Sequence, residues 1–388
     1  MTENKIKIYR VSTVSHSLSI LLKKQFSYLG TKGYSYTLLC SPDERILRTA
    51  VEEKAKFLPL YITRSISPFR DLFELFRLIK YLRRDRPDII HSHSPKGGLI
   101  AMIGGFLVGT KLRVHTVAGL PLVEATGSYR FLLICLEKLI YSCANFVIFN
   151  SPMQAAMAIQ NGWIRNDKVK VIGKGSSNGI DLKYFRRSPQ IGLEVNEIKT
   201  GLRLNNAFVI SFVGRIAKSK GIEELVEAFQ ILQIKHSNLA LVLVGMRDDA
   251  DPISSDCWHK IIGDQSIRWI DHKDDVRPYF QMSDAFVFPS YREGFPQVLM
   301  QACAMQCSII STNINGANEI IDDGVTGLLI NTKSVEEIVS STEKLITDQP
   351  LRESLAQNSR KVIEDGYDQL LFWDSLDKLY SNNLKGND

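Results

Sequence analysis

The sequence predicts an α/β protein made of two doubly wound, parallel-sheet domains, and three observations support this fold class. The chain has 388 residues, more than one hydrophobic core usually grows to. Short apolar, β-branched runs alternate with longer amphipathic stretches, which is typical of parallel strands joined by helices. A polar stretch, 186–199, separates two such sets. We therefore expect domains over 1–185 and 200–365, with 366–388 as a final helix that returns to the first domain.

Six strands and three helices are expected in the first domain. The strands are Lys5–Val14, Tyr36–Cys40, Ile89–His93, Leu112–Val117, Phe146–Asn150 and Val169–Ile172. The helices are Leu18–Leu29, Phe69–Leu82 and Phe131–Tyr141.

The second domain repeats this plan. Its expected strands are Phe208–Val213, Leu239–Gly245, Ile267–Ile270, Ala285–Phe288, Ser308–Ser311 and Gly327–Ile330. Its expected helices are Ile222–Ile234, Val298–Met305, Val335–Ile346 and Leu351–Val362, and Gln369–Tyr380 follows as the last helix.

Composition points to a cytoplasmic globular protein. Apolar residues make up 44% of the chain and charged residues 23%, and no apolar run approaches the roughly 18 residues of a membrane span. The first residues, Met1–Asn4, carry no signal-peptide pattern. The six cysteines show no paired metal spacing, so we expect free, buried thiols in a reducing compartment.

Charge is distributed unevenly along the chain. Up to Phe185 there are 27 Lys and Arg against 13 Asp and Glu, whereas the remainder holds 21 against 29. The two halves should therefore face different partners. No helix-turn-helix, zinc-finger or aromatic-basic pattern accompanies the basic half, so an anionic membrane surface or a lipid-phosphate acceptor fits it better than nucleic acid.

The segment from Phe212 to Glu224 reads as a strand, a glycine, a basic loop and a helix. Anions bind to parallel sheets where a loop leads from the carboxyl end of a strand to the N-terminus of a helix. Arg215 would offer a planar fork and Lys220 a point charge to a diphosphate. By charge alone, two solvated basic residues are the commoner explanation.

A second stretch, from Ser290 to Ala302, also follows a strand and opens a helix after Gly294, Phe295 and Pro296. The free N–H groups at a helix start suit phosphate. Glu293 is placed to accept hydrogen bonds from sugar hydroxyls, and Gln301, about two turns along, to reach a ribose. Taken alone, Glu293 is also explained as an acid favoured by the helix dipole.

Together these stretches resemble the donor site of family-4 retaining glycosyltransferases, which have the GT-B fold of two facing Rossmann-like domains with a central cleft. The resemblance covers nearly the whole chain. Further matching motifs occur in family order: Asp88–Gly98, Arg113–Leu120, Asn178-Gly-Ile-Asp181 and Asn318–Leu328. Each is weak alone, but their shared order makes a strong signal.

The resemblance implies roles for individual residues. Arg215 and Lys220 match the pair that binds the donor diphosphate and stabilises it as it leaves. Glu293 matches the first acid of the family's Glu-x7-Glu motif, which contacts the transferred sugar. Gln301 replaces the second acid, which holds the ribose, so weaker donor binding is expected. The matches for the phosphate-binding loop are Gly294, Phe295 and Gln297, and those for the base-reading segment run from Ile270 to His272.

Four histidines in the first domain need separate interpretation. His115 ends a strand before a Gly-containing loop, where the family has a histidine beside the donor sugar, although Ala118 holds the usual position. A strand histidine satisfied by its surroundings is an equally good reading of His115. His91 and His93 share one face of a strand and suggest core or cleft-lining residues more than a metal site. His16 lies where the family has a Gly-rich acceptor loop.

The segment Phe69–Arg86 carries an apolar stripe and a basic end. Most of the stripe, which includes Phe69, Phe73 and Phe76, is expected to pack on the sheet. The basic end could still lie against anionic headgroups, so we expect peripheral association with the inner membrane surface.

The resemblance implies transfer of a hexose or N-acetylhexosamine from a UDP-sugar to a glycan, with a polyprenyl-diphosphate-linked acceptor of bacterial surface polysaccharide synthesis. No metal or other cofactor is expected, because Arg215, Lys220 and a helix N-terminus supply positive charge. Two alternatives on the same fold are a nucleotide-sugar epimerase and a catalytically silent sugar-nucleotide-binding protein. A dinucleotide oxidoreductase is disfavoured, since no Gly-x-Gly-x-x-Gly follows the first strand.

Overall fold

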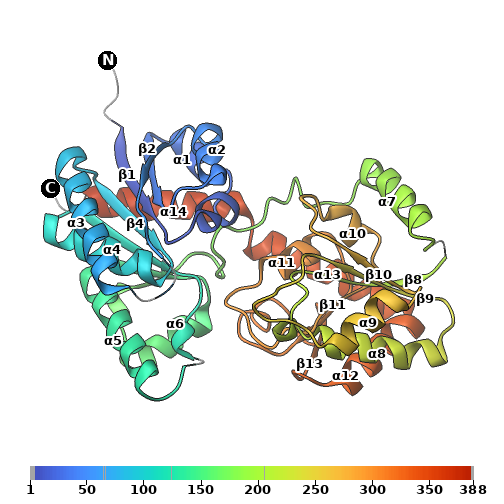
Figure 1. Ribbon diagram of the computed structural model, residues 1–388. Helices are drawn as coiled ribbons and strands as arrows, with labels where there is room; N and C mark the ends of the chain where they lie inside the picture. Colours follow the sequence, from blue (N-terminus) through green and yellow to red (C-terminus); the bar gives the residue numbers. More distant parts are fainter. Residues whose placement is uncertain (1–4, 64, 66, 124, 205, 386–388) are drawn as a thin grey trace. The chain divides into compact units, whose positions relative to one another are not determined.

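The computed structural model describes residues 5–63, 65, 67–123, 125–204 and 206–385, and its chain forms two compact units (Figure 1). The first unit comprises Met1–Gly179 and Gln369–Asp388, and the second comprises Ile180–Asp368. The stretch 186–199, expected as a linker, lies inside the second unit and largely forms α7 (Pro189–Gly201). Its polar character reflects an exposed helix whose first turn is capped by Ser188. Met1–Asn4, interpreted above, lie outside the described residues.

The described part of the first unit contains a parallel sheet of seven strands in the order β3-β2-β1-β4-β5-β6-β7. The strands are β1 (Ile6–Val11), β2 (Tyr34–Cys40), β3 (Lys56–Pro59), β4 (Ile89–His93), β5 (Leu112–Val117), β6 (Phe146–Phe149) and β7 (Val169–Val171).

Helices cover both faces of this sheet. They are α1 (Gln25–Gly30), α2 (Glu44–Glu52), α3 (Pro68–Asp85), α4 (Pro95–Val108), α5 (Gly127–Cys143), α6 (Pro152–Gln160) and α14 (Gln369–Lys385), with shorter turns η1 (Ser17–Leu21), η2 (Pro121–Val123) and η3 (Asn166–Lys168).

Alternation along the strands divides the core of the first unit in two. Ile8 packs in a cluster with side chains of α1, α2 and α14, whereas its neighbour Tyr9 packs in a cluster with those of α3, α4 and α5. Ile89 and Ile90 divide between the clusters in the same way. Because successive strand residues point to opposite faces, both faces of the sheet are buried, as the apolar strand sequences predict.

Several elements of the first unit differ from the sequence prediction, and α2 and α6 were not predicted. The expected helix Leu18–Leu29 divides into η1 and α1, because Lys24 adopts a left-handed conformation with a φ of 67°. Buried Glu53 accepts hydrogen bonds from the N–H groups of Lys24 and Ser27 at this break. Strand β3 was not predicted, because it is short and only partly buried.

Helix α4 was also not predicted, because four glycines interrupt its sequence. The tertiary structure explains one of them. A Cβ atom at Gly98 would lie 2.4 Å from the His115 ring, so glycine permits the helix to approach the sheet closely.

The prediction for α3 was wrong about which side of the helix is buried. Leu78 and Leu82 are buried, whereas Phe69, Phe73 and Phe76 are exposed, and Phe69 is 93% exposed. Buried Glu74 is tolerated on the packed side because Arg77 pairs with it at 3.0 Å. The helix therefore has two apolar faces, and only one of them meets the core.

The described part of the second unit contains a parallel sheet of six strands in the order β10-β9-β8-β11-β12-β13. The strands are β8 (Phe208–Val213), β9 (Leu239–Val244), β10 (Ile267–Ile270), β11 (Ala285–Phe288), β12 (Ile309–Thr312) and β13 (Leu328–Ile330). The helices besides α7 are η4 (Lys218–Lys220), α8 (Ile222–Lys235), α9 (Ser255–Gly263), α10 (Arg277–Gln281), α11 (Gln297–Ala304), α12 (Val335–Thr347) and α13 (Gln349–Gly366).

Helices also cover both faces of the second sheet. Helix α8 packs against α9 and α12, whereas α11 packs against α13 and α10 against α7 (Figure 1). The predicted class of two doubly wound α/β domains is confirmed. In each sheet the strand order reverses at one point, between β1 and β4 and between β8 and β11. Ligands of such folds bind outside the carboxyl ends of the strands at this switch point.

Candidate active site

The loops predicted to bind the donor follow β8 and β11, which are neighbours in the sheet although β9 and β10 lie between them in sequence. The loop after β8 carries Arg215 and Lys220, and the loop after β11 carries Glu293. The topology therefore brings all three residues to the switch point of the second unit.

These two loops contact each other directly. Gly221 precedes α8 with a φ of 69°, and a Cβ atom there would lie 2.2 Å from the carbonyl oxygen of Pro289. The N–H of Tyr291 donates to the carbonyl of Ser219 at 2.9 Å. Glycine at 221 thus allows the basic loop to lie against the residues that follow β11.

Both predicted diphosphate-binding cations contact carboxylates. Lys220 Nζ donates to Glu293 Oε1, and the two side chains are 16% and 17% exposed. The guanidinium of Arg215, which is 62% exposed, donates to Asp248. Each cation is therefore paired with an anionic oxygen, the kind of atom that a phosphate group would also offer.

Asp248 was missed by the sequence analysis. It follows β9, and its N–H donates to the Ile216 carbonyl at 3.1 Å, while the Ile216 N–H donates to Met246 at 2.8 Å. These bonds tie the loop after β9 to the loop that holds Arg215. An acid soon after a predicted strand, at the same edge as Arg215, was the signal that could have found it.

The predicted phosphate-binding turn leads from Glu293 into α11, which begins at Gln297 after Pro296. Phe295 is buried, with its ring centroid 5.8 Å from that of Tyr367. Gly294 precedes it on the same turn, and Gln301 lies one helical turn after Gln297, half-buried. The turn therefore presents its backbone beside Glu293, while Phe295 anchors it to the core.

The predicted base-reading residues lie further along the same edge. Ile270 ends β10, the outer strand of the sheet, and its carbonyl accepts the N–H of Gly245 at 2.9 Å. His272 is exposed, and its Nε2 lies 3.4 Å from Asp274 Oδ1. Two strands separate β10 from β11, so the base-reading role of these residues stays a prediction.

In the first unit, Asn178 of the Asn-Gly-Ile-Asp motif anchors a buried polar network. Asn178 Oδ1 accepts hydrogen bonds from Gln25 Nε2 at 2.9 Å and from Trp373 Nε1 of α14 at 2.6 Å. Gln25 in turn accepts a bond from Arg10 at 2.6 Å. This network connects β1, α1 and the last helix of the chain.

His91 belongs to the same network. Its Nδ1 accepts from Arg10 Nη1 at 2.8 Å, because arginine only donates, and its Nε2 lies 2.7 Å from Thr116 Oγ1. Burial, and then the charge of Arg10, keep the pKa of His91 well below its usual value. His91 is therefore a neutral core residue, as one of the two sequence interpretations proposed.

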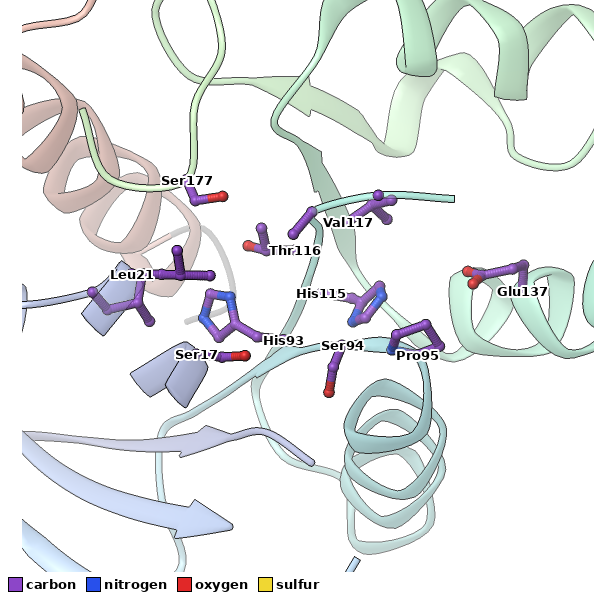
Figure 2. Close-up of a pocket in the computed structure, with 13 residues that line it drawn as sticks. Ser17, Leu21, His93, Ser94, Pro95, His115, Thr116, Val117, Glu137 and Ser177 are labelled. Atoms are coloured by element: carbon purple, nitrogen blue, oxygen red, sulfur yellow. The ribbon is translucent and has the colours of Figure 1, made fainter. Parts of the chain in front are cut away.

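His115 and His93 line a cavity of the first unit (Figure 2). His115 is 2% exposed, its Nδ1 lies 2.8 Å from Ser92 Oγ, and burial lowers its pKa to about 3. An imidazole with this pKa stays neutral at physiological pH and is a poor proton acceptor. The stacked rings of His91 and His93 lie 4.7 Å apart.

The loop after β1, which contains His16, is tied to the start of α4. Thr13 Oγ1 accepts the N–H of Gly97 at 3.1 Å and lies 2.8 Å from Ser94 Oγ.

Among the described residues, no group of three or more His, Cys, Asp or Glu could hold a metal ion. Five of the six cysteines are buried and free, and Cys135 is exposed and free, unlike the buried thiols expected. In the part of the chain that the structure describes, no helix has the length and apolar character needed to cross a membrane.

A family model matches most of each unit. The model for "Glycosyl transferases group 1" matches residues 195–362, and that for "Glycosyl transferase 4-like domain" matches residues 25–175. The first match contains the predicted donor-site residues, and the second contains most of the residues that line the cavity of the first unit.

Relatives and solved structures match along the whole chain. The chain is 33% identical over 379 residues, 98% of each sequence, to the capsular polysaccharide biosynthesis glycosyltransferase CapM of Staphylococcus aureus. It is 25% identical, over 98% of this chain and 97% of the relative, to an Escherichia coli UDP-Gal:alpha-D-GlcNAc-diphosphoundecaprenol alpha-1,3-galactosyltransferase. The crystal structure of Anabaena HepE in complex with UDP superimposes with a TM-score of 0.80 at 17% identity, covering 97% of this chain and all of that one. The GT-B fold is thereby confirmed.

Proposed function

Because the chain belongs to the group 1 glycosyl transferases and is a glycosyltransferase, we propose that it moves a hexose or N-acetylhexosamine from a UDP-sugar, with retention, to a glycan on polyprenyl diphosphate. We assign this step to bacterial surface polysaccharide synthesis. The name of the Staphylococcus relative supports the pathway, and the name of the Escherichia relative supports both a UDP-sugar donor and a diphosphoundecaprenol-linked acceptor.

One observation carries the proposal: Lys220 pairs with Glu293, and Arg215 lies on the same loop as Lys220, after β8, whose neighbour in the sheet is β11. A donor bound there would place its diphosphate on the two cations, and its oxygens would replace the carboxylates of Asp248 and Glu293 as partners. Glu293, released from Lys220, would then accept hydrogen bonds from hydroxyls of the transferred sugar.

The reaction follows from this arrangement. The acceptor hydroxyl attacks the anomeric carbon on the face from which the diphosphate leaves, so the bond from that carbon to the phosphate oxygen breaks as the new glycosidic bond forms. The departing phosphate takes the hydroxyl proton. Arg215 and Lys220 stabilise the charge that develops on the diphosphate, while the surrounding loops position donor and acceptor.

We propose that transfer needs no divalent metal, because Arg215, Lys220 and the N-terminus of α11 supply the positive field. Transfer measured in excess EDTA should equal transfer in added Mg²⁺ or Mn²⁺. Loss of activity in EDTA that is restored by a metal would contradict this part of the proposal.

A panel of UDP-sugars offered with extracted lipid-linked acceptors tests the function. We expect one UDP-sugar to yield UDP and an extended, α-linked glycan. Incubation with the donor alone separates the alternatives: interconversion of the UDP-sugar without acceptor would identify an epimerase. Tight UDP binding without transfer to any acceptor would identify a silent binding protein.

We also propose that the enzyme works in the cytoplasm at the inner face of the plasma membrane, through the first unit. Helix α4 packs against both α3 and α5 on one side of the sheet (Figure 1). All three helices expose large apolar side chains, which we call the α3–α5 surface: Phe69, Leu72, Phe73 and Phe76 of α3, Phe106 and Leu107 of α4, and Tyr129, Phe131, Leu132 and Leu139 of α5.

The charges of α3 suit an anionic bilayer. Its acids are paired: Asp71 with Lys96 at 2.7 Å, Glu74 with Arg77 at 3.0 Å and Asp85 with Arg84 at 2.6 Å. The helix also carries further exposed cations, Arg70, Lys80 and Arg83. Aromatic side chains flanked by unneutralised cations favour insertion among anionic headgroups.

Sedimentation with phosphatidylglycerol vesicles tests the α3–α5 surface. Replacement of Phe69, Phe73 and Phe76 by serine should lower vesicle binding by about tenfold or more, because exposed apolar area drives insertion. Ile234 on α8 is 86% exposed, so Ile234→Ser is the matched control and should bind as the wild type does. Equal binding by the triple variant would refute the membrane role of α3.

A further inference from the structure

A polar pocket lies at the amino-terminal edge of the second sheet, whereas the loops predicted to bind the donor follow the carboxyl ends of β8 and β11. Asp284 directly precedes β11, and Ser308 directly precedes β12. The pocket has a volume of about 320 Å³. Its lining includes two arginines, two acids and two glutamines: Arg187, Arg352, Asp284, Glu353, Gln306 and Gln357. It is therefore separate from the predicted donor site.

The lining of this pocket is almost entirely polar. Among the described residues that line it, Ala356 is the only one without a polar side chain. Pockets for drug-sized ligands have roughly 300–1,000 Å³ and are mostly apolar, so this pocket has room for a small molecule but offers it hydrogen bonds instead of apolar contact. Arg187, Glu353 and Gln357 are exposed, and a ligand can therefore reach them from solvent.

Backbone carbonyls hold the two arginines in place. Arg187 Nε donates to the carbonyl of Met305 at 2.9 Å, and its Nη2 donates to that of Gln306 at 2.8 Å, just after α11. Arg352 Nη1 donates at 2.5 Å to the carbonyl of Leu345, in the last turn of α12. Because a guanidinium carries five N–H donors, both arginines keep donors for a further partner.

A third arginine at the same end of α11 provides a contrast. Arg360 also donates to a carbonyl there, that of Ala304, and it pairs with Glu364 at 2.7 Å. In the described part of the chain, Arg187 and Arg352 form no ion pair. The carbonyl contacts explain where all three guanidinium groups lie, but those of Arg187 and Arg352 keep an unneutralised charge beside the pocket. Such groups favour an oxyanion such as phosphate, which accepts from the guanidinium fork.

The two acids of the lining suit hydroxyl groups. Asp284 Oδ2 accepts the N–H of Val209 at 2.8 Å, and Glu353 Oε1 accepts from Gln349 Nε2 at 2.7 Å. Each carboxylate has a second oxygen that can accept a hydrogen bond from a ligand hydroxyl. The acids repel a bare phosphate ion, whereas a phosphate joined to a hydroxylated ring offers a matching group to the arginines and to the acids.

We propose that this pocket binds a sugar phosphate, with its phosphate group on the two arginines and its hydroxyl groups on the two acids. The ligand of this pocket is not a substrate of the transfer step. The proposal does not rest on the proposed function, because no residue of the pocket belongs to the predicted donor site.

Opposite charges placed at Gln357 test the proposal without disturbing the hydrogen bonds of the arginines. The full chain is first saturated with UDP, so that the predicted donor site is filled. It is then titrated by calorimetry with glucose 1-phosphate, glucose 6-phosphate, N-acetylglucosamine 1-phosphate, inorganic phosphate and glucose. Glu227 is exposed on α8 and does not line the pocket. Glu227→Gln is the matched control, because it changes the net charge by the same amount as Gln357→Lys.

We expect at least one sugar phosphate to bind about tenfold more tightly than inorganic phosphate or glucose, because it engages the arginines and the acids together. Gln357→Glu should weaken this binding by about tenfold and Gln357→Lys should tighten it by about threefold, with smaller effects in about 0.5 M salt. Arg187→Gln should weaken it by about tenfold, and Glu227→Gln should bind as the wild type does.

The outcomes separate this inference from the proposed function. Equal sugar phosphate affinity in Gln357→Glu, Gln357→Lys and the wild type would overturn the inference. So would a wild-type chain that binds none of the three sugar phosphates, or one that binds inorganic phosphate equally well. Sugar phosphate binding that depends on the charge at Gln357, in a chain that transfers no sugar from any UDP-sugar, would support the pocket and overturn the proposed function.

Discussion

The carboxyl edges of the two sheets occupy the same place in the same topology but have opposite chemistry. At the switch point of the second unit, Arg215 and Lys220 contact carboxylates, and Arg215 is largely exposed. At the edge of the first unit, His93, His115 and Glu137 are buried around a cavity without cations among its described lining. The fold supplies the position of a site, while the loop residues decide which ligand it takes.

The net charge of each half of the chain does not match the charge of the residues at the carboxyl edge of its sheet. The first 185 residues are strongly basic and the rest acidic, yet the residues predicted to bind the donor diphosphate lie in the acidic part. Much of the basic excess lies on exposed surfaces such as α3, where Arg70, Lys80 and Arg83 remain after its acids are paired. The charge of a domain therefore describes its surface rather than its site.

The largest expected effect is a pH dependence of the stability of the folded chain, caused by Glu137 at the carboxyl edge of the first sheet. Burial raises the pKa of Glu137 to about 7 from an ordinary value of 4.5, so between these values the folded chain holds a proton that the unfolded chain has lost. Stability attributable to Glu137 should therefore fall as pH rises through this window, by roughly 3 kcal/mol in all, and stay level above it.

Urea unfolding of wild type and Glu137→Leu at pH 5 and pH 8 measures this effect. Since leucine does not titrate, the difference in free energy of unfolding between the two proteins should shift in favour of Glu137→Leu at the higher pH. Parallel pH profiles would show that the carboxyl is not desolvated, and the contrast between the two edges would weaken.

At the predicted donor site of the second unit, turnover should fall most strongly when Arg215 is lost. Arg215→Ala should lower turnover by about 100-fold, because one preorganised charge contact to the departing diphosphate is removed. Lys218 is an exposed cation on the same loop, and Lys218→Ala, measured in the same steady-state assay, should keep most of the activity. Equal losses for both variants would mean that the loop attracts anions only by its net charge.

Glu293→Gln separates two proposed roles of Glu293, which are contact with the transferred sugar and competition with the donor diphosphate for Lys220. Loss of the carboxylate should reduce turnover by about tenfold, while UDP should bind slightly more tightly, because Lys220 no longer has an internal counterion. Steady-state kinetics and calorimetric titration with UDP measure the two quantities. Weaker UDP binding in this variant would contradict competition between Glu293 and the diphosphate.

The smallest expected effect tests the resemblance at Gln301. A carboxylate accepts from both hydroxyls of a ribose, whereas an amide offers one acceptor. Gln301→Glu should therefore lower the KM for the UDP-sugar by about threefold, with the acceptor KM unchanged. A higher donor KM would indicate that the chain has adapted its ribose contact to the amide.

Several strands followed from the sequence without structural help. The bounds of β4, β5, β8 and β11 agree with the prediction, because buried parallel strands are short apolar runs ended by glycine or polar residues. The residues of the two predicted donor-site loops were singled out because they follow such strands. Helix α4 was not predicted, because its sequence is rich in glycine. Glycine permits the helix to approach β5 closely, and the local sequence does not reveal this contact.

Other features depended on long-range packing. The surroundings of Asp248 and Glu137 became known only from the tertiary structure, which places Asp248 against Arg215 and Glu137 beside a cavity. Glu137 interrupts an apolar helix, which was a usable signal, but the same pattern also fits an acid that reaches solvent.

The amino-acid sequence by itself determined the alternation of strands and helices, the two-domain plan and the loops that carry Arg215, Lys220 and Glu293, because these depend on periodicity and on residues close together in the chain. Only the tertiary structure decided which face of α3 is buried, which carboxylates hold the two cations and which side chains surround the cavity. These depend on contacts between segments far apart in sequence, and the pattern of a single segment does not specify its neighbours.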